Sequence, residues 1–103
     1  MSNGTVVNDT TEFIGLVQPG GVLMIRDPRT APPWHNLTTL TGYPAGVVDV
    51  SLSSQNTVVY VTVNTSTGGV FQTTCTVQPT PGTSGNPAWP GNCTAFVNVT
   101  PPL

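Results

Sequence analysis

Hydrophobic and polar residues alternate with a period of two in four segments, which cover residues 47–52, 57–64, 69–78 and 93–100. Successive side chains of a strand point to opposite faces, so this alternation predicts half-buried β-strands. The polar residues 53–56 predict a turn, and therefore a hairpin, between the first two segments. The predicted apolar faces consist of Val48, Val50 and Leu52; of Val59, Val61 and Val63; of Phe71, Thr73, Cys75 and Val77; and of Cys93, Ala95, Val97 and Val99.

Two segments in the first third of the chain are apolar at both parities. They are residues 12–17, EFIGLV, and residues 22–25, VLMI. A strand that is covered on both faces has this pattern. It predicts either a central position in the fold or insertion into a neighbouring subunit. Residues 28–34, PRTAPPW, then interrupt the strands, because consecutive prolines cannot donate hydrogen bonds to a ladder.

The chain has no window of 3.6-residue periodicity long enough to predict a helix. Short strands separated by closely spaced turn residues are typical of a sandwich or a small barrel. We therefore predict an all-β fold: an antiparallel β-sandwich of the immunoglobulin-like kind with about seven strands. Residues 19–103 are predicted to form this single domain, and residues 1–18 an extended N-terminal arm or donor strand.

Cys75 and Cys93 both fall on the apolar parity of their predicted strands, which is the placement that an internal disulfide requires. The segment between them, residues 79–92, contains four prolines and three glycines and predicts an irregular loop. Closing a loop of this size stabilises the folded state by about 3 kcal/mol in the chain-entropy model. A disulfide predicts an extracellular protein or one at a cell or virion surface. The alternative is two separate buried thiols.

Charged residues make up 6% of the chain, the formal net charge is −2, and lysine is absent. Without a basic surface, nucleic-acid binding is not expected. No apolar run is long enough to predict a membrane span. The first residues lack the basic and apolar regions of a signal peptide, which predicts a mature chain or export by another route. Such weak charge favours association, so copies of the same chain are the expected partners.

Two short motifs occur twice. GGV at residues 20–22 is followed by WHNLT at 34–38, and GGV at 68–70 is followed by FVNVT at 96–100. The spacing within the second copy is longer by the length of the segment between the cysteines. The sequence predicts that the second copy is the first with an insertion.

With this repeat, residues 34–103 resemble the blades of sialidase-type (Asp-box) β-propellers, and residues 43–74 correspond to most of one blade. The resemblance implies an alternative fold of two propeller-like blades. The family's Ser-x-Asp-x-Gly-x-Thr-Trp box is interrupted here by Cys75. Sialidase chemistry also needs several arginines, and this chain has only Arg26 and Arg29.

The motif Asn-x-Ser/Thr, with serine in the third place at Asn64 and threonine at the other sites, is more frequent than chance predicts. It makes candidate glycosylation sites of Asn3, Asn8, Asn36, Asn64, Asn92 and Asn98. The alternative is that Asn and Thr are this protein's preferred polar surface residues. Glycans are therefore a second possible partner.

No catalytic, metal-binding or cofactor-binding residues are predicted. The single histidine, His35, has no acid and no activated serine at triad spacing, and we expect it in a loop. Trp34 and Trp89 are candidates for stacking on sugar rings, although both also suit local packing beside prolines.

These patterns predict a structural subunit and not an enzyme. The subunit would assemble into an extracellular filament, an appendage or a virion surface, with residues from about 5 to 18 completing the sheet of a neighbouring copy. The expected anchors of this strand addition are Phe13, Ile14, Leu16 and Val17. Two alternatives are a lectin-like carbohydrate-binding module that forms an oligomeric propeller and a virion decoration protein.

Overall fold

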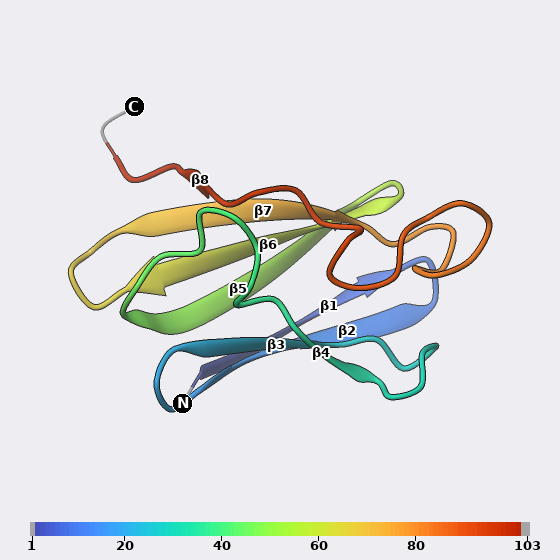
Figure 1. The fold of residues 1–103 in the computed structure, drawn as a ribbon, viewed down its shortest axis with the longest axis horizontal. Coiled ribbons are helices and arrows are strands. Elements are labelled where there is room, and N and C mark those ends of the chain that lie inside the picture. Colours follow the sequence, from blue (N-terminus) through green and yellow to red (C-terminus); the bar gives the residue numbers. More distant parts are fainter. Residues whose placement is uncertain (1, 102–103) are drawn as a thin grey trace.

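The computed structural model describes residues 2–101, which form two antiparallel sheets of four strands each. Figure 1 shows the sheets as two packed layers, with loops at both ends. Sheet A contains β1 (Ser2–Asn8), β2 (Thr11–Gln18), β3 (Val22–Arg26) and β4 (Trp34–Asn36). Sheet B contains β5 (Val47–Gln55), β6 (Val58–Thr65), β7 (Val70–Thr76) and β8 (Val97–Asn98).

The predicted all-β sandwich with a disulfide is confirmed, with eight strands in place of about seven. In each sheet the strands lie in chain order, as two successive meanders. This order differs from the immunoglobulin-like arrangement, in which strands alternate between the sheets. The difference arises because short turns join every pair of neighbours from β1 to β3 and from β5 to β7, so each hairpin closes onto the sheet already formed.

The core lies between the sheets and consists mainly of the inward faces of four strands. Its fully buried apolar side chains include Phe13, Leu23, Ile25, Leu37, Val59, Val61, Val63 and Val77. The prediction that Val59, Val61 and Val63 share a buried face is confirmed. Thr73, Cys75 and Val77 are also buried as predicted, because alternation along β7 matches the pleat.

The predicted N-terminal arm is not what the structure contains. Residues 2–18 form β1 and β2 of the chain's own sheet, and β2 pairs with β3 as well as with β1. Phe13 is 0% exposed and Val17 is 3% exposed, so both side chains fill the chain's own core. Two of the four hydrophobic anchors expected to enter a neighbouring copy, Phe13 and Val17, are therefore used within the core of the chain itself.

In two segments the side chains predicted to point inward do not do so, because strand pairing is irregular there. A β-bulge between Val47 and Asp49 turns Val48 outward, leaving it 52% exposed while Val47 is buried. Near the C-terminus only Val97 and Asn98 form a strand, and Val97 is 58% exposed while Phe96 is buried. The apolar parity predicted for residues 93–100 is wrong because this segment is mostly irregular.

The two sheets approach most closely where β1 lies along β5 (Figure 1). Gly4 and Gly15 are paired directly across β1 and β2. A Cβ on Gly4 would lie 3.2 Å from the carbonyl oxygen of Val50, and one on Gly15 would lie 3.3 Å from the Leu52 side chain. The absence of side chains at this pair therefore permits the close approach of β1 to β5.

The repeated motif has the same hydrogen-bonding role in both sheets. In sheet A, Leu37 N donates to Leu23 O, and Leu23 N donates to the Thr38 hydroxyl. In sheet B, Val99 N donates to Val70 O, and Val70 N donates to the Thr100 hydroxyl. In each copy the Asn side chain accepts from the Thr backbone N–H two residues later, at 2.8 Å from Asn36 and 2.9 Å from Asn98.

The motif therefore seals the outer edge of β3 and of β7 with side-chain groups. By their hydrogen bonds, Leu23 in sheet A corresponds to Val70 in sheet B. Aligning the two GGV triplets would instead match Val22 with Val70, which is one residue away. The hairpin turns before β3 and β7 differ in length, which accounts for the offset.

Replacing either capping threonine by valine should destabilise the fold. Thr38→Val and Thr100→Val each leave a strand N–H without its acceptor, at a cost of about 1 kcal/mol in the free energy of unfolding. Urea denaturation measures the change. Thr39→Val, at an exposed neighbouring position, is the control and should change stability little. Equal stability of all three variants and the unmodified chain would contradict the capping role.

Candidate functional site

The outer face of sheet A, the side turned away from sheet B, is apolar at its centre. The strand registers place twelve side chains on this face: Asn3, Thr5, Val7, Glu12, Ile14, Leu16, Gln18, Val22, Met24, Arg26, Trp34 and Asn36. Leu16 and Met24 are directly paired across β2 and β3, with Ile14 beside them. All three are partly exposed, and Val7 at the margin is 60% exposed.

This face explains why the N-terminal segments are apolar at both parities. The inward parity of β2 and β3 supplies the core, as predicted for strands at the centre of the fold. The outward parity supplies Ile14 and Leu16, predicted as anchors of an inserted strand, but they lie on a flat sheet surface. The sequence predicted that these strands are covered on both faces. In residues 2–101 the core covers the inward face, and the insertion into a neighbouring subunit is not what covers the outward one.

The outer face of sheet B is polar at its centre. Thr62 is directly paired with Gln72, and the Gln72 amide donates to the Thr62 hydroxyl at 3.1 Å. Tyr60 is paired with Thr74, and its hydroxyl donates to Gln55 at 3.2 Å. The centre of the outer face is thus apolar in sheet A and polar in sheet B, where the exposed apolar side chains Val48 and Val97 lie on the edge strands β5 and β8.

A second candidate site is a buried ion pair at the loop end of the sandwich. Asp27 directly follows β3 and is 0% exposed. Its carboxylate accepts hydrogen bonds from Arg29 Nε and Nη2, both at 2.9 Å, and from Trp89 Nε1 at 3.1 Å. The Arg29 guanidinium also lies over the ring of Phe13, 5.2 Å from its centroid. Both carboxylate oxygens are therefore occupied by groups of the protein itself.

The Arg29 guanidinium continues this network to sheet B. Arg29 Nη1 donates to Gln78, and the Gln78 amide donates to Asn8 at 3.1 Å. The Asn8 amide in turn donates to the Ser54 hydroxyl at 2.7 Å and to the backbone carbonyl of the β5–β6 turn at 2.8 Å. We call the chain from Asp27 through Arg29, Gln78 and Asn8 to this turn the Asp27 network. It joins both sheets and the two proline-rich loops.

His35 lies beside the network, on the inward side of β4. Its ring stacks on Trp89 with centroids 5.7 Å apart, and its Nε2 lies 2.7 Å from the Thr30 hydroxyl. In residues 2–101 no carboxylate is hydrogen-bonded to His35, so the Thr30–His35 pair lacks the third member of a triad. Burial lowers the pKa of His35 below 6.5, although the negative charge of Asp27 opposes this effect.

The two tryptophans lie in different environments. Trp89 is only 8% exposed and packs between Phe13 and His35, so it is a core residue and cannot stack on a sugar ring. Trp34 lies on the outer face of sheet A, paired with Arg26, and is partly exposed. Both tryptophans stand next to a proline in the sequence, so the sequence could not tell the buried one from the exposed one. The burial of Trp89 depends on a contact with Asp27, which is 62 positions away.

The six candidate glycosylation sites fall into two groups. Asn3, Asn36, Asn64 and Asn98 are exposed. Asn8 and Asn92 are 3% and 7% exposed, and the amide of Asn92 donates to the Thr76 carbonyl at 2.9 Å. A sugar on either buried amide would displace these hydrogen bonds, so these two sites are structural. Glycosylation of the exposed four stays a prediction.

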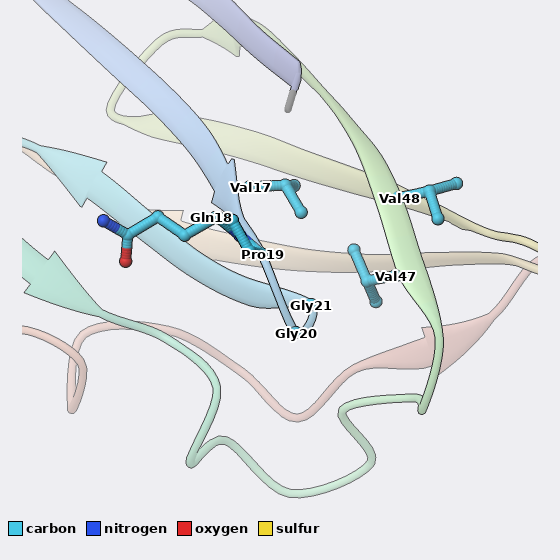
Figure 2. Close-up of a pocket in the computed structure, with 7 residues that line it drawn as sticks. All are labelled: Val17, Gln18, Pro19, Gly20, Gly21, Val47 and Val48. Carbon is cyan, nitrogen blue, oxygen red and sulfur yellow. The ribbon is translucent and has the colours of Figure 1, made fainter.

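Two hollows lie at the end of the sandwich opposite the Asp27 network. The first, of about 290 Å³, lies between the β2–β3 turn and the start of β5. Figure 2 shows Val17 and Val47 on its wall, with Val48 pointing away from them. It has no ionisable lining residue. The second, of about 440 Å³, is lined by Phe71, Asn98 and several threonines.

No helix in residues 2–101 has the length and hydropathy to cross a membrane. The described residues also contain no cluster of three or more His, Cys, Asp or Glu side chains. Comparison of the chain with models of protein families, with curated proteins and with solved structures gives no significant match.

Stability should fall on acidification in two steps. Burial alone would raise the pKa of Asp27, but hydrogen bonds from Arg29 and Trp89 outweigh it and lower the pKa below 3.8. The folded-state pKa of His35 is likewise below its ordinary 6.5. A lowered pKa means that the folded state binds the proton less readily than the unfolded state. The His35 contribution is complete above pH 6.5 and is lost as pH falls through its folded pKa; that of Asp27 is complete above pH 3.8 and is lost below it.

Urea denaturation between pH 3 and pH 8 measures this dependence. His35→Gln should remove the step nearer neutral pH and leave the acidic step, because the chain has a single histidine. An unchanged pH profile in this variant would contradict the assignment of the upper step to His35.

Proposed function

We propose that this protein is a structural subunit that associates with copies of itself through the outer face of sheet A. The observation that carries the proposal is the difference between the two outer faces. Leu16 pairs with Met24 at the centre of one face, and Thr62 pairs with Gln72 at the centre of the other. Association would remove the apolar face from water and leave the polar face in solvent.

The low charge of the chain supports association through a face of this kind. Of the charged side chains, Asp27 is buried and pairs with Arg29, whose side chain is 20% exposed. Few charged groups therefore lose water when two copies meet, and desolvation of charge is the usual obstacle to burying a surface. The proposed contact replaces the strand addition predicted from residues 1–18, because residues 2–18 form strands of the chain's own sheet A.

We place the assembly outside the cell, in a filament, an appendage or a virion surface. The Cys75–Cys93 disulfide supports an oxidising compartment. A virion decoration protein is one form of this proposal.

A charge at the centre of the outer face of sheet A should prevent association. The Leu16→Glu side chain lies on the face and not in the core, so the domain should fold while the assembly is lost. Sedimentation velocity across a range of concentrations gives the mass relative to the 10.7 kDa chain. Thr62→Glu, at the corresponding place on sheet B, is the matched control and should assemble as the unmodified chain does.

The unmodified chain should show a mass above that of one copy at high concentration. A single-copy mass for the unmodified chain throughout the range would refute the proposal. So would an equal loss of association in the Thr62→Glu control.

A carbohydrate-binding module is the second candidate function. Two four-stranded meanders in chain order match the strand arrangement of propeller blades, and Trp34 is partly exposed on the outer face of sheet A. A ring needs at least four blades, and hence two or more copies. It ranks second because ring stacking would press the apolar face of one copy against the polar face of the next.

A glycan array tests this second function. Binding that Trp34→Ala weakens about tenfold or more would support it, since an aromatic anchor carries much of such a contact. Tyr60→Ala, on the opposite face, is the control and should bind as before. Absence of binding to any glycan by the unmodified chain would exclude the lectin-like function.

A further inference from the structure

We infer that the partner of the outer face of sheet A is the same face of a second copy, related to the first by a two-fold axis that lies in the plane of contact. This inference rests on the proposed function and specifies its geometry. In such an isologous contact each copy contributes the same surface patch. The contact closes a pair, which becomes the unit for any larger assembly.

The other large surfaces of a neighbouring copy match the apolar face poorly. The centre of the outer face of sheet B carries hydroxyl and amide groups, which would lose water without gaining partners against Leu16 and Met24. Of the edge strands, β1 and β5 pack along each other, and β4 and β8 are only three and two residues long. The outer face of sheet A is thus the large surface of the second copy that is apolar at its centre.

Charge also favours the pairing of like faces. The twelve outward positions of sheet A include two ionisable side chains, Glu12 and Arg26, and these have opposite signs. Among residues 2–101 neither forms a salt bridge within the chain, where the ion pair joins Asp27 and Arg29. Two such faces bring no net charge together, and each supplies one cation and one anion at the margin of the apolar centre.

The size of the face determines how strong the pair should be. With strands about 4.8 Å apart and about 6.8 Å for every two residues, each outward position covers roughly 33 Å². Twelve positions therefore give roughly 400 Å² of flat face per copy, or about 800 Å² for the pair before side-chain relief is counted. Stable specific interfaces bury about 1,200–2,000 Å². We therefore expect a pair that dissociates on dilution.

Two oppositely charged double variants test the two-fold geometry. One carries Leu16→Glu and Met24→Glu, and the other carries Leu16→Lys and Met24→Lys. Each alone should remain a single copy, because like charges meet at the centre of the contact. A 1:1 mixture should associate, since every central contact then joins Glu to Lys. The dissociation constant of the mixture should be at least about tenfold lower than that of either variant alone.

Changing both central positions makes the result independent of which of them meets which. Circular dichroism and thermal unfolding check that both variants fold. If the unmodified chain associates but the mixture does not, the contact joins two different surfaces and the two-fold geometry is overturned, while the proposed self-association stands. If the unmodified chain has the mass of a single copy, both the two-fold geometry and the proposed self-association are refuted.

A measurement on the unmodified chain gives an independent test. Peroxide oxidises an accessible methionine thioether, and Met24 is partly exposed in a single copy. In the symmetric pair the Met24 side chain is covered, so its oxidation, followed by mass spectrometry, should slow as the protein concentration rises. In the double lysine variant residue 24 is no longer methionine, so Leu16→Glu alone serves as the control and should show no concentration dependence. A Met24 oxidation rate that is independent of concentration in an associating chain would overturn the inference.

Discussion

The loop end of the molecule depends on one buried carboxylate. Asp27 has no exposed surface, and an unpaired carboxylate there would cost several kilocalories per mole in solvation. Arg29 and Trp89 supply its hydrogen bonds, and both come from proline-rich loops without regular structure. Neutralising this charge therefore requires the two loops to be in place against β3. The order of the loops is a consequence of the charge that they surround.

The remainder of the sandwich consists of two halves with the same local construction. Each half of the chain forms a four-stranded meander, and each meander ends in an Asn-aliphatic-Thr segment that completes the hydrogen bonds of its third strand. The paired glycines at positions 4 and 15 allow the halves to approach through β1 and β5. The outward residues differ between the halves, so the repeat is structural while the surfaces have different characters.

Sequence alone predicted the features that depend on period and local turns. The alternation in residues 57–64 and 69–78 identified β6 and β7 with their buried faces, and the cysteine parity identified the disulfide. The predicted inward position of Val48 was wrong, because a β-bulge reverses which side chains point inward and no residue type marks the bulge clearly in the sequence. Sequence alone also missed β1, and it took residues 1–18 for an arm. Apolar residues at both parities report that two faces are hydrophobic, but not whether the second is covered by the same chain.

The candidate sites were harder to predict because they depend on distant contacts. The Asp27 network links residues up to 70 positions apart, and no local motif encodes it. The repeat, in contrast, was visible in the sequence, although its meaning as an edge seal was not. That seal has a wider consequence. It continues the pairing of β3 and β7 beyond the short edge strands β4 and β8, so the N-terminal ends of β3 and β7 offer no free main-chain groups on which further chains could stack.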